Sequence, residues 1–208
     1  LSQRIFAIAL GYEDLNDHEQ LRYDPLMSVL AGRAPTEQTG CDLAGKSTLN
    51  RLELTPVRAS RKSRYKKIAA RHSDIEDFFV KVYLRSHRRP PKRIVLDIDA
   101  TDDPLHGHQS GRFFLGYYQN YCYLPLYIFA GSHLLCAKLR PANIDPAAGA
   151  VKQLDRIVAG IRARWPKVQI IIRADSGFCR ESIMNWCETN QVDYILGLAK
   201  NPRLSDRL

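Results

Sequence analysis

Aspartates gather at the end of one apolar segment, and they are the residues of this chain best suited to chemistry. Residues 93–103 read RIVLDIDATDD, so a hydrophobic run leads into four carboxylates. If the run is a buried strand, its alternation places Asp97 and Asp99 on one face and Leu96 and Ile98 on the other. Burying ionised carboxylates is costly unless a cation or dense hydrogen bonding compensates. The segment therefore predicts a divalent-metal site at a strand end.

Two groups of polar residues beside this strand have plainer interpretations. Asp102 and Asp103 precede Pro104, a combination typical of a turn. His106 and His108 lie two residues apart among glycines, and a third metal ligand is missing from their surroundings. We therefore interpret the two histidines as part of a flexible loop.

A second apolar segment, residues 168–175, also ends in an aspartate, Asp175. An amphipathic helix is predicted before it, with Asp145 as N-cap and Pro146 at the first helical position. A strand that returns through such a helix lies beside the first strand by the usual right-handed crossover, so Asp99 and Asp175 are expected to converge. Two converging carboxylates suit two divalent cations roughly 3.5 to 4 Å apart, the arrangement that catalyses in-line phosphoryl displacement. Mg²⁺ keeps several waters and needs few protein ligands.

The remaining pattern predicts a mostly helical region before residue 93 and an α/β domain after it. Arg and Pro residues at 85–92 break regular structure, so we place the domain boundary between residues 92 and 93. The α/β part is expected to contain a strand at 93–100, a hairpin of strands at 121–129 and 133–139, a helix to residue 165, a strand at 168–175, a helix through residue 187 and a strand at 192–198.

Positive charge is concentrated before the acidic strand. The 208 residues carry a net charge of +9, and Arg58 to Arg93 alone contain thirteen Lys and Arg against three acids, a net of +10. Charge runs are commonly a solvated helical face, but this density of bases favours phosphate contacts and a polyanionic partner. The predicted DNA-binding residues are Arg58, Arg61, Lys62, Arg64, Lys66, Lys67, Arg88 and Arg89.

Cysteines and hydropathy indicate an intracellular protein without a membrane partner. The five cysteines form no CxxC pair and have no zinc-finger spacing, which is typical of thiols in a reducing cytoplasm. The longest apolar stretch, residues 121–137, is interrupted by Pro125, Gly131 and His133, so it predicts paired strands and not a membrane helix.

Several motifs together carry a family resemblance that runs through nearly the whole chain. They are GYEDLND at 11–17, DAT at 99–101, YCYLPL at 121–126, LRP at 139–141 and IRADSGF at 172–178. With these motifs the chain resembles the DDE-type transposases of bacterial insertion sequences. The resemblance implies an RNase H-like (retroviral-integrase-like) α/β fold, a mixed sheet with flanking helices, preceded by a mostly helical, basic, DNA-binding region at 1–92.

The resemblance also implies the chemistry. Asp99 and Asp175 match the first two catalytic acids and metal ligands, with Mg²⁺ or Mn²⁺ as cofactor and Asp97 and Thr101 in supporting positions. The implied substrate is double-stranded DNA, both at the element's terminal inverted repeats and at the target. In such enzymes water cuts the DNA to expose a 3′-hydroxyl, which then attacks target DNA. The resemblance further implies a synaptic complex that can hold a homodimer. The implied location is the bacterial cytoplasm, on the chromosome.

One part of the family pattern is missing. The third acid of the family is a Glu on a later helix, and residues 93–208 match only the first part of the catalytic domain. Glu181 and Glu188 belong to the helix directly after Asp175, which is the wrong element for that role. We therefore expect this chain to be a fragment that is catalytically incomplete.

Two alternatives remain open from the residues. Asp97, Asp99 and Thr101 fit the D-x-D-x-T strand end of haloacid dehalogenase-like phosphatases, with Asp97 as nucleophile. That class also needs a later Lys and an acidic magnesium-binding segment, and the sequence after Asp175 is a poor match. The second alternative is a transposase remnant that binds DNA without cutting it.

Overall fold

The chain forms two compact units, Leu1–Arg71 and His72–Leu208. The computed structural model describes residues 1–33, 43–53, 71–105 and 107–205. The predicted boundary after residue 92 differs from this division because the helix α5 (His72–Ser86) packs with the second unit. Its buried residues Val80, Tyr83 and Leu84 belong to the same hydrophobic core as Ile94 of the first strand.

The first unit is built from short helices, as the sequence predicts for this region. Asp24 begins the third helix by accepting hydrogen bonds from the backbone N–H groups of Leu26 and Met27, and Pro25 stands at its first position. The elements are α1 (Ser2–Ala9), a 3-10 turn η1 (Leu15–Asp17), α2 (His18–Leu21), α3 (Pro25–Leu30) and α4 (Lys46–Glu53).

A buried polar pair supplements the small core of this unit. His18 is fully buried, and its Nδ1 lies 3.0 Å from Nε2 of Gln3. Gln3 also bonds both backbone groups of Ala44, which ties α1 to the chain before α4. Burial lowers the pKa of His18, so the neutral imidazole is favoured. The apolar core around this pair consists of Ala7, Leu21, Met27 and Leu43.

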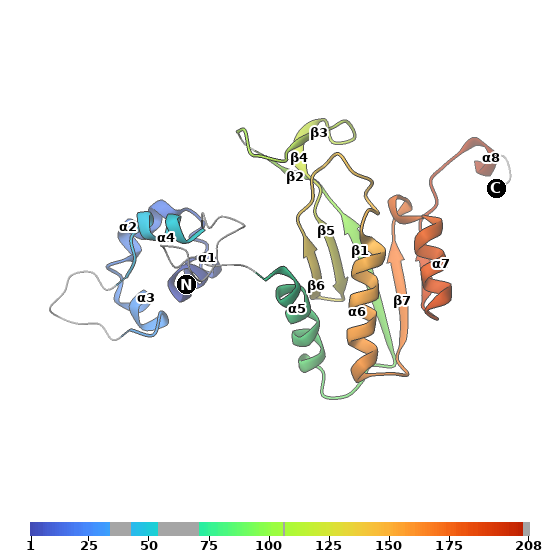
Figure 1. The fold of residues 1–208 in the computed structure, drawn as a ribbon, viewed down its shortest axis with the longest axis horizontal. Helices are drawn as coiled ribbons and strands as arrows, with labels where there is room; N and C mark the ends of the chain where they lie inside the picture. Colours follow the sequence, from blue (N-terminus) through green and yellow to red (C-terminus); the bar gives the residue numbers. More distant parts are fainter. Residues whose placement is uncertain (34–42, 54–70, 106, 206–208) are drawn as a thin grey trace. The chain divides into compact units, whose positions relative to one another are not determined.

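A five-stranded mixed sheet forms the centre of the second unit, with strand order β6-β5-β1-β7-β8 (Figure 1). The neighbours β5 and β7 pair with β1 in antiparallel and parallel sense respectively, β6 is antiparallel to β5, and β8 is parallel to β7. The predicted crossover from β1 to a parallel β7 is confirmed. The strands are β1 (Arg93–Ala100), β5 (Leu126–Ala130), β6 (His133–Lys138), β7 (Gln169–Ala174) and β8 (Asp193–Leu196).

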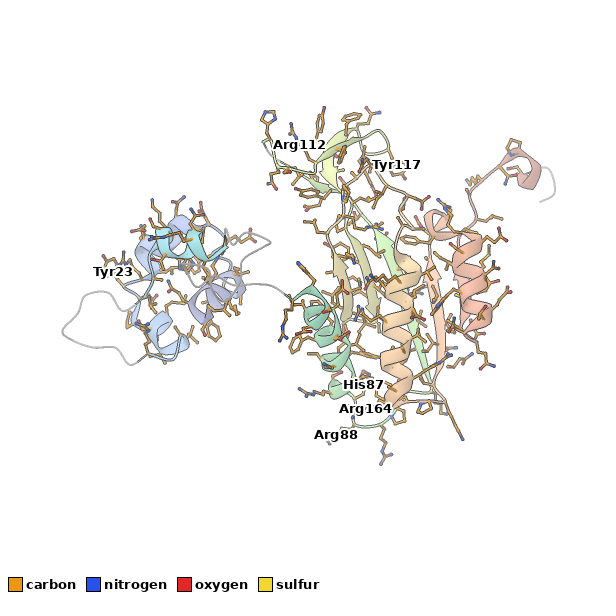
Figure 2. The ribbon with its side chains drawn as sticks, viewed as in Figure 1. Tyr23, His87, Arg88, Arg112, Tyr117 and Arg164 are labelled. Atoms are coloured by element: carbon orange, nitrogen blue, oxygen red, sulfur yellow. The ribbon has the colours of Figure 1, made fainter. Side chains whose placement is uncertain are left out.

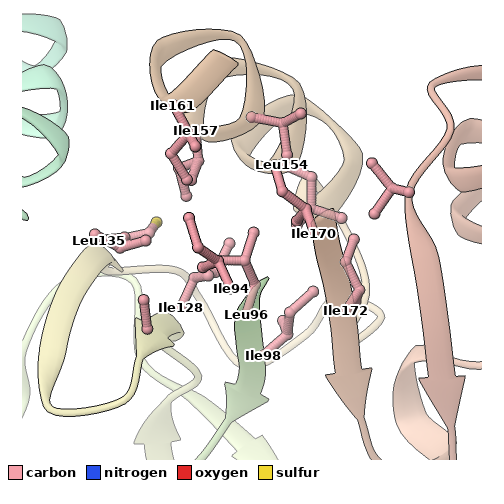
Figure 3. Close-up of a cluster of buried hydrophobic side chains, with 14 of the residues drawn as sticks. Ile94, Leu96, Ile98, Ile128, Leu135, Leu154, Ile157, Ile161, Ile170 and Ile172 are labelled. Atoms are coloured by element: carbon pink, nitrogen blue, oxygen red, sulfur yellow. The ribbon is translucent and has the colours of Figure 1, made fainter. Parts of the chain in front are cut away.

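Three helices, α5, α6 (Ala150–Arg164) and α7 (Glu181–Thr189), pack on one face of this sheet (Figure 1). The alternation predicted for β1 is confirmed, since Ile94, Leu96 and Ile98 are buried on the helical side. Figure 3 shows these side chains meeting α6 together with residues of the neighbouring strands. From α6 the core receives Leu154, Ile157, Val158 and Ile161. The predicted α/β mixed sheet with flanking helices is thereby confirmed.

The start of α6 differs from the prediction. Asp145 accepts a hydrogen bond from the N–H of Ala147 at 2.7 Å, which closes a local turn instead of capping the helix. The N-cap is Gly149, whose φ of 76° is a left-handed conformation that glycine adopts without a steric penalty. The helix therefore begins at Ala150, after an extra turn.

A second, three-stranded sheet with order β2-β4-β3 branches from the end of β1. The strand predicted at 121–129 is divided between the two sheets at Leu124-Pro125, because proline has no N–H to continue a ladder. The expected turn at Asp103-Pro104 instead forms a short strand that pairs with β4. The strands are β2 (Asp103–Pro104), β3 (Phe113–Leu115) and β4 (Asn120–Tyr123).

The remaining elements are the 3-10 turn η2 (Ser176–Phe178), which follows β7, and α8 (Pro202–Ser205). Among the helices that the structure describes, none combines the length and apolar character needed to cross a bilayer.

Candidate active site

Asp99 and Asp175 lie at the same end of neighbouring parallel strands. In the pairing of β1 with β7, the last partners are Ile98 and Ala174. Asp99 and Asp175 are each the next residue along their strand, so both carboxylates emerge where the pairing ends. Adjacent strands are about 4.8 Å apart. The register therefore brings together the two aspartates that the sequence selects.

Each of these carboxylates uses one oxygen locally. Oδ1 of Asp99 accepts a hydrogen bond from the N–H of Ala100 at 2.8 Å. Oδ1 of Asp175 accepts one from the N–H of Gly177 at 2.9 Å and so caps η2. Both residues are exposed, and within the described residues neither forms an ion pair or uses its Oδ2. Two carboxylate oxygens on neighbouring strands thus remain available for a cation.

Asp97 is in a different situation from Asp99, although both lie on the same face of β1. Its two oxygens accept hydrogen bonds from Nε and Nη2 of Arg173 on β7, at 2.5 and 3.0 Å. This bidentate pair raises the pKa of Arg173. Asp97 is therefore held in an ion pair two residues below the strand end, where its oxygens are not free to act as a nucleophile.

Thr101 and Asp102 connect the strand end to the smaller sheet. Burial raises the pKa of Tyr118, and a hydrogen bond with Thr101 opposes that rise. Oδ2 of Asp102 accepts a hydrogen bond at 3.2 Å from Nδ2 of Asn120, the first residue of β4. Thr101 thus contacts Tyr118, in the turn between β3 and β4.

Gly197 is a supporting residue that sequence reasoning missed. A Cβ atom built on Gly197 would lie 2.8 Å from the backbone nitrogen of Ser176 and 3.1 Å from the carbonyl carbon of Asp175. Its N–H donates to the carbonyl of Ala174 at 2.9 Å. The chain after β8 therefore passes directly against the backbone that presents Asp175. The available signal was a glycine at the end of a strand, which often marks a close backbone approach.

A charged pair beside the Asp175 turn was also missed. Asp145 accepts hydrogen bonds from Nε and Nη2 of Arg180 at 3.2 and 2.9 Å. Burial alone would raise the pKa of Asp145, but the bonds from Arg180 and Ala147 outweigh it and the pKa is lowered. The pair lines an open cavity of about 460 Å³ with Gly149, Val151 and Ser182 among its other residues.

Arg140 fixes the loop that carries Asp145. The side chain is only 6% exposed and donates to the carbonyls of Leu124, Pro146 and Ala148. Burial lowers its pKa, and its Nη2 has no hydrogen-bond partner among the described atoms. The motif LRP at 139–141 thus contains an arginine that is structural in this loop.

Of the predicted DNA-binding residues, the structure describes Arg88 and Arg89, and these two lie away from the two acids. Arg58, Arg61, Lys62, Arg64, Lys66 and Lys67 are outside the described residues. Arg88 and Arg89 are exposed in the loop that leads into the start of β1, whereas Asp99 is near the end of that strand. Figure 2 shows Arg88 at this end of the sheet. Asp99 comes six residues after Arg93, a separation of roughly 20 Å along a strand. The two ends of β1 therefore carry charge of opposite sign.

The histidine loop has no metal site in the described part of the chain. His106 is outside the described residues, and Nδ1 of His108 lies 2.8 Å from Nη2 of Arg112. No group of three His, Cys, Asp or Glu side chains that could hold a metal occurs in the residues that the structure describes. Asp99 and Asp175 are therefore two oxygen donors that could hold a cation, and the described residues place no third acid with them. Hard oxygen donors of this kind fit Mg²⁺ or Mn²⁺.

Among the solved structures that the chain matches are transposases, at low similarity. The catalytic domain of the Mos1 mariner transposase aligns with 67% of this chain and 67% of its own length, at 15% identity and a TM-score of 0.37. The Mos1 paired end complex with Mn aligns with 98% of this chain and 61% of its own, at 12% identity and a TM-score of 0.38. A piggyBac transposase synaptic complex with hairpin DNA aligns with 98% of this chain and 48% of its own length, at 14% identity and a TM-score of 0.40.

The match to a family model identifies the family of this chain, whereas the solved structures are only distantly similar. No curated protein matches the chain by sequence. The model of the family described as transposase DDE domain group 1 matches residues 1–208, which is the whole chain, and so confirms the resemblance carried by the motifs. The structure adds two strand-end aspartates on neighbouring strands of a mixed sheet. The chain therefore belongs to the DDE transposases, group 1, a family of polynucleotidyl transferases.

Proposed function

We propose that this chain is the part of an insertion-sequence transposase that binds a divalent metal and DNA for strand cleavage and transfer at terminal inverted repeats. The observation that carries the proposal is the contrast within β1. Asp97 has a cationic partner in Arg173, whereas Asp99 and its neighbour Asp175 have none among the described residues. Neighbouring carboxylates without a counter-charge are stabilised by a cation.

The cation is Mg²⁺ or Mn²⁺ in this proposal. When bound, it would activate a water or 3′-hydroxyl and stabilise the leaving oxygen of the phosphodiester. Asp99 and Asp175 hold it through the oxygens that are not used locally. Gly197 keeps the backbone of Asp175 in place, and Arg173 keeps Asp97 out of the ligand set by neutralising it.

The partner is double-stranded DNA, at the transposon ends and at the target. The eight Lys and Arg residues predicted to bind DNA contact phosphates, and Arg88 and Arg89 do so at the far end of β1 from the acids. A homodimer brings two ends together in a synaptic complex. The reaction takes place in the bacterial cytoplasm, on the chromosome.

The 208 residues by themselves are proposed to bind metal and DNA without cutting DNA. The described residues provide two carboxylates at the site, and the family's chemistry uses a third. Robust metal-dependent cleavage of a cognate transposon end by these 208 residues would contradict this part of the proposal.

Calorimetric titration with Mg²⁺ and with Mn²⁺, with and without duplex DNA, tests the metal site. The double variant Asp99→Ala, Asp175→Ala is expected to lose metal binding. Asp193→Ala is the matched control, because Asp193 is an exposed aspartate at the start of β8, level with Ile171 of β7 and away from the strand end that carries Asp175. Metal binding that persists in the double variant, or that is lost equally in the control, would remove the basis of the proposal.

The phosphatase alternative is tested with a small phosphoester. We expect no turnover, because both oxygens of Asp97 are engaged by Arg173. Turnover that disappears in Asp97→Asn would replace the transposase mechanism by a phosphatase mechanism at this strand end.

A further inference from the structure

The smaller sheet and the turn between its strands β3 and β4 expose several aromatic side chains. Tyr117 is 85% exposed, Phe114 56%, Tyr121 50% and Phe113 41%, all within nine residues of sequence. Large aromatic side chains ordinarily bury much of their surface, so a cluster of exposed ones marks a surface for binding.

This exposure coexists with a well-packed inner face. Cys122, Leu124 and Ala142 form a separate buried cluster, against which Leu115 and Tyr118 pack. Residues of one strand alternate between the two faces, so anchoring Cys122 on the inside directs Tyr121 outward. The smaller sheet is thus held in place on one side while its aromatic side remains open.

Three side chains on the open side form one continuous group. Phe114 and Tyr121 are direct partners in the pairing of β3 with β4, and their ring centres are 5.5 Å apart in an edge-to-face arrangement. The guanidinium carbon of Arg112 lies 4.6 Å from the centre of the Tyr121 ring. Arg112 is itself fixed by hydrogen bonds to the carbonyl of Gly107 and to His108. Phe114, Tyr121 and Arg112 are called the aromatic platform below.

The platform lies at the acidic end of the main sheet. The smaller sheet begins at Asp103, directly after β1, and the Asp102–Asn120 hydrogen bond links the end of β1 to β4. Figure 2 shows Arg112 and Tyr117 at this end, whereas Arg88 and Arg164 lie at the other. The platform and the strand end that carries Asp99 are thus at the same end of the main sheet.

We propose that the aromatic platform binds an unpaired DNA base next to the phosphodiester that is cut, an inference that rests on the proposed function. Aromatic rings and an arginine plane are the groups on which unstacked bases stack. Bases inside a duplex hide their faces in the helical stack, so only a frayed or flipped base can use the platform.

The local charge supports stacking as the mode of binding. Asp102 and Asp103 lie in the same segment as Arg112, so this surface does not carry the excess of Lys and Arg side chains that phosphate neutralisation requires. The guanidinium over Tyr121 still offers one cation to the neighbouring phosphate. Affinity from the platform is therefore expected to depend on unpaired bases and only weakly on salt concentration.

The test compares DNA binding by the 208-residue protein in the presence of EDTA, so that cleavage plays no part. Fluorescence anisotropy is measured for a blunt duplex and for a duplex of the same sequence with unpaired nucleotides at one end. The variant Phe114→Leu, Tyr121→Leu keeps apolar side chains but removes both ring faces. Phe78→Leu is the matched control, because Phe78 is a 57% exposed aromatic on α5, outside the platform.

We expect the double variant to lose roughly tenfold or more in affinity for the forked DNA, with unchanged affinity for the blunt duplex and an unchanged salt dependence. Phe78→Leu should leave both affinities unchanged. Arg112→Lys, which retains charge without a planar group, should show a smaller loss on forked DNA alone. Circular dichroism and urea unfolding establish that each variant is folded.

Other outcomes separate the inference from the proposed function. If the double variant binds both DNAs with the affinity of the unaltered protein, the platform does not bind an unpaired base, and the DNA-binding function remains. The same holds if the variant weakens both DNAs equally. If the unaltered protein binds neither DNA, the proposed function of this chain fails and the platform with it. Self-association that is abolished by the double variant, without an effect on DNA, would assign the surface to a second copy of the chain.

Discussion

The two faces of the five-stranded sheet are made by the same strands and have opposite properties. On the helical face, Leu96, Ile128 and Ile172 are fully buried under α6. On the other face, Asp99 and Arg173 are exposed and Ile195 is 62% exposed. The helices that pack on the sheet in the described part of the chain all lie on the first face. One face therefore supplies stability, and the other leaves charged side chains open to solvent.

This contrast follows from the two-residue period of a strand. Each residue of β1 is committed to one face by its position, so Leu96 and Asp97 are neighbours in sequence but experience different environments. A chemically active face can thus change without disturbing the core beneath it. The following predictions test how far the two faces are independent, beginning with the largest expected effect.

Leu96→Ala should reduce the free energy of unfolding by about 2–5 kcal/mol, because it leaves a cavity in the centre of the buried face. Val95→Ala on the opposite face should cost clearly less, since Val95 is only partly buried. Urea denaturation of the two variants gives both values. Equal losses would mean that the open face is covered in solution.

Gly197→Ala should weaken metal binding by on the order of tenfold, as is typical for residues that orient a ligand. The added methyl group would collide with the backbone of Asp175 and Ser176. Calorimetric titration with Mn²⁺ measures the effect. Gly116→Ala is the control, because a Cβ there would meet no atom within 4 Å. Unchanged affinity in Gly197→Ala would show that the Asp175 turn is not held by this contact.

Cys136 and Cys187 report how well the helical side excludes water. Burial raises the pKa of each thiol from 9.0 to about 11. Among the cysteines that the structure describes, we expect iodoacetamide at pH 8 to modify the partly exposed Cys179 first, and Cys136 and Cys187 only on unfolding. Peptide mapping by mass spectrometry distinguishes the sites. Rapid modification of Cys136 in the folded protein would contradict a closed core.

The same thiols give a pH dependence with a definite sign. Between pH 9 and about 11 the unfolded chain releases protons that the folded chain retains, so unfolding is favoured as pH rises. The stability contributed by the protonated thiols is fully present below pH 9 and lost toward pH 11. Urea midpoints across this range should fall for the unaltered protein and fall less for Cys136→Ala.

Asp97→Asn should have the smallest effect on stability. The Asp97–Arg173 pair is accessible to water, with side-chain exposures of 35% and 62%, and exposed ion pairs contribute little. The shift in urea midpoint should be smaller than that of Val95→Ala, and Mn²⁺ affinity should be retained. A loss of affinity as large as that of Asp99→Asn would place Asp97 among the metal ligands.

Local sequence rules predicted the elements that depend on periodicity. The alternation of β1, the apolar stripe of α6 and the crossover to β7 follow from hydrophobic spacing and chain connectivity, and all three are confirmed. Predictions that depended on a single polar residue were less accurate. Asp145 looked like a helix cap but closes a preceding turn, and Asp103 looked like a turn residue but pairs with β4.

The sequence by itself determined the two aspartates, the strands that present them and the family, because strand period and motifs are local properties of the chain. Only the tertiary structure decided what surrounds them. That Asp97 meets Arg173, that Gly197 supports Asp175 and that Phe114 lies opposite Tyr121 are consequences of register between segments distant in sequence. Register is set by the packing of whole strands against helices and against one another, which no single segment encodes.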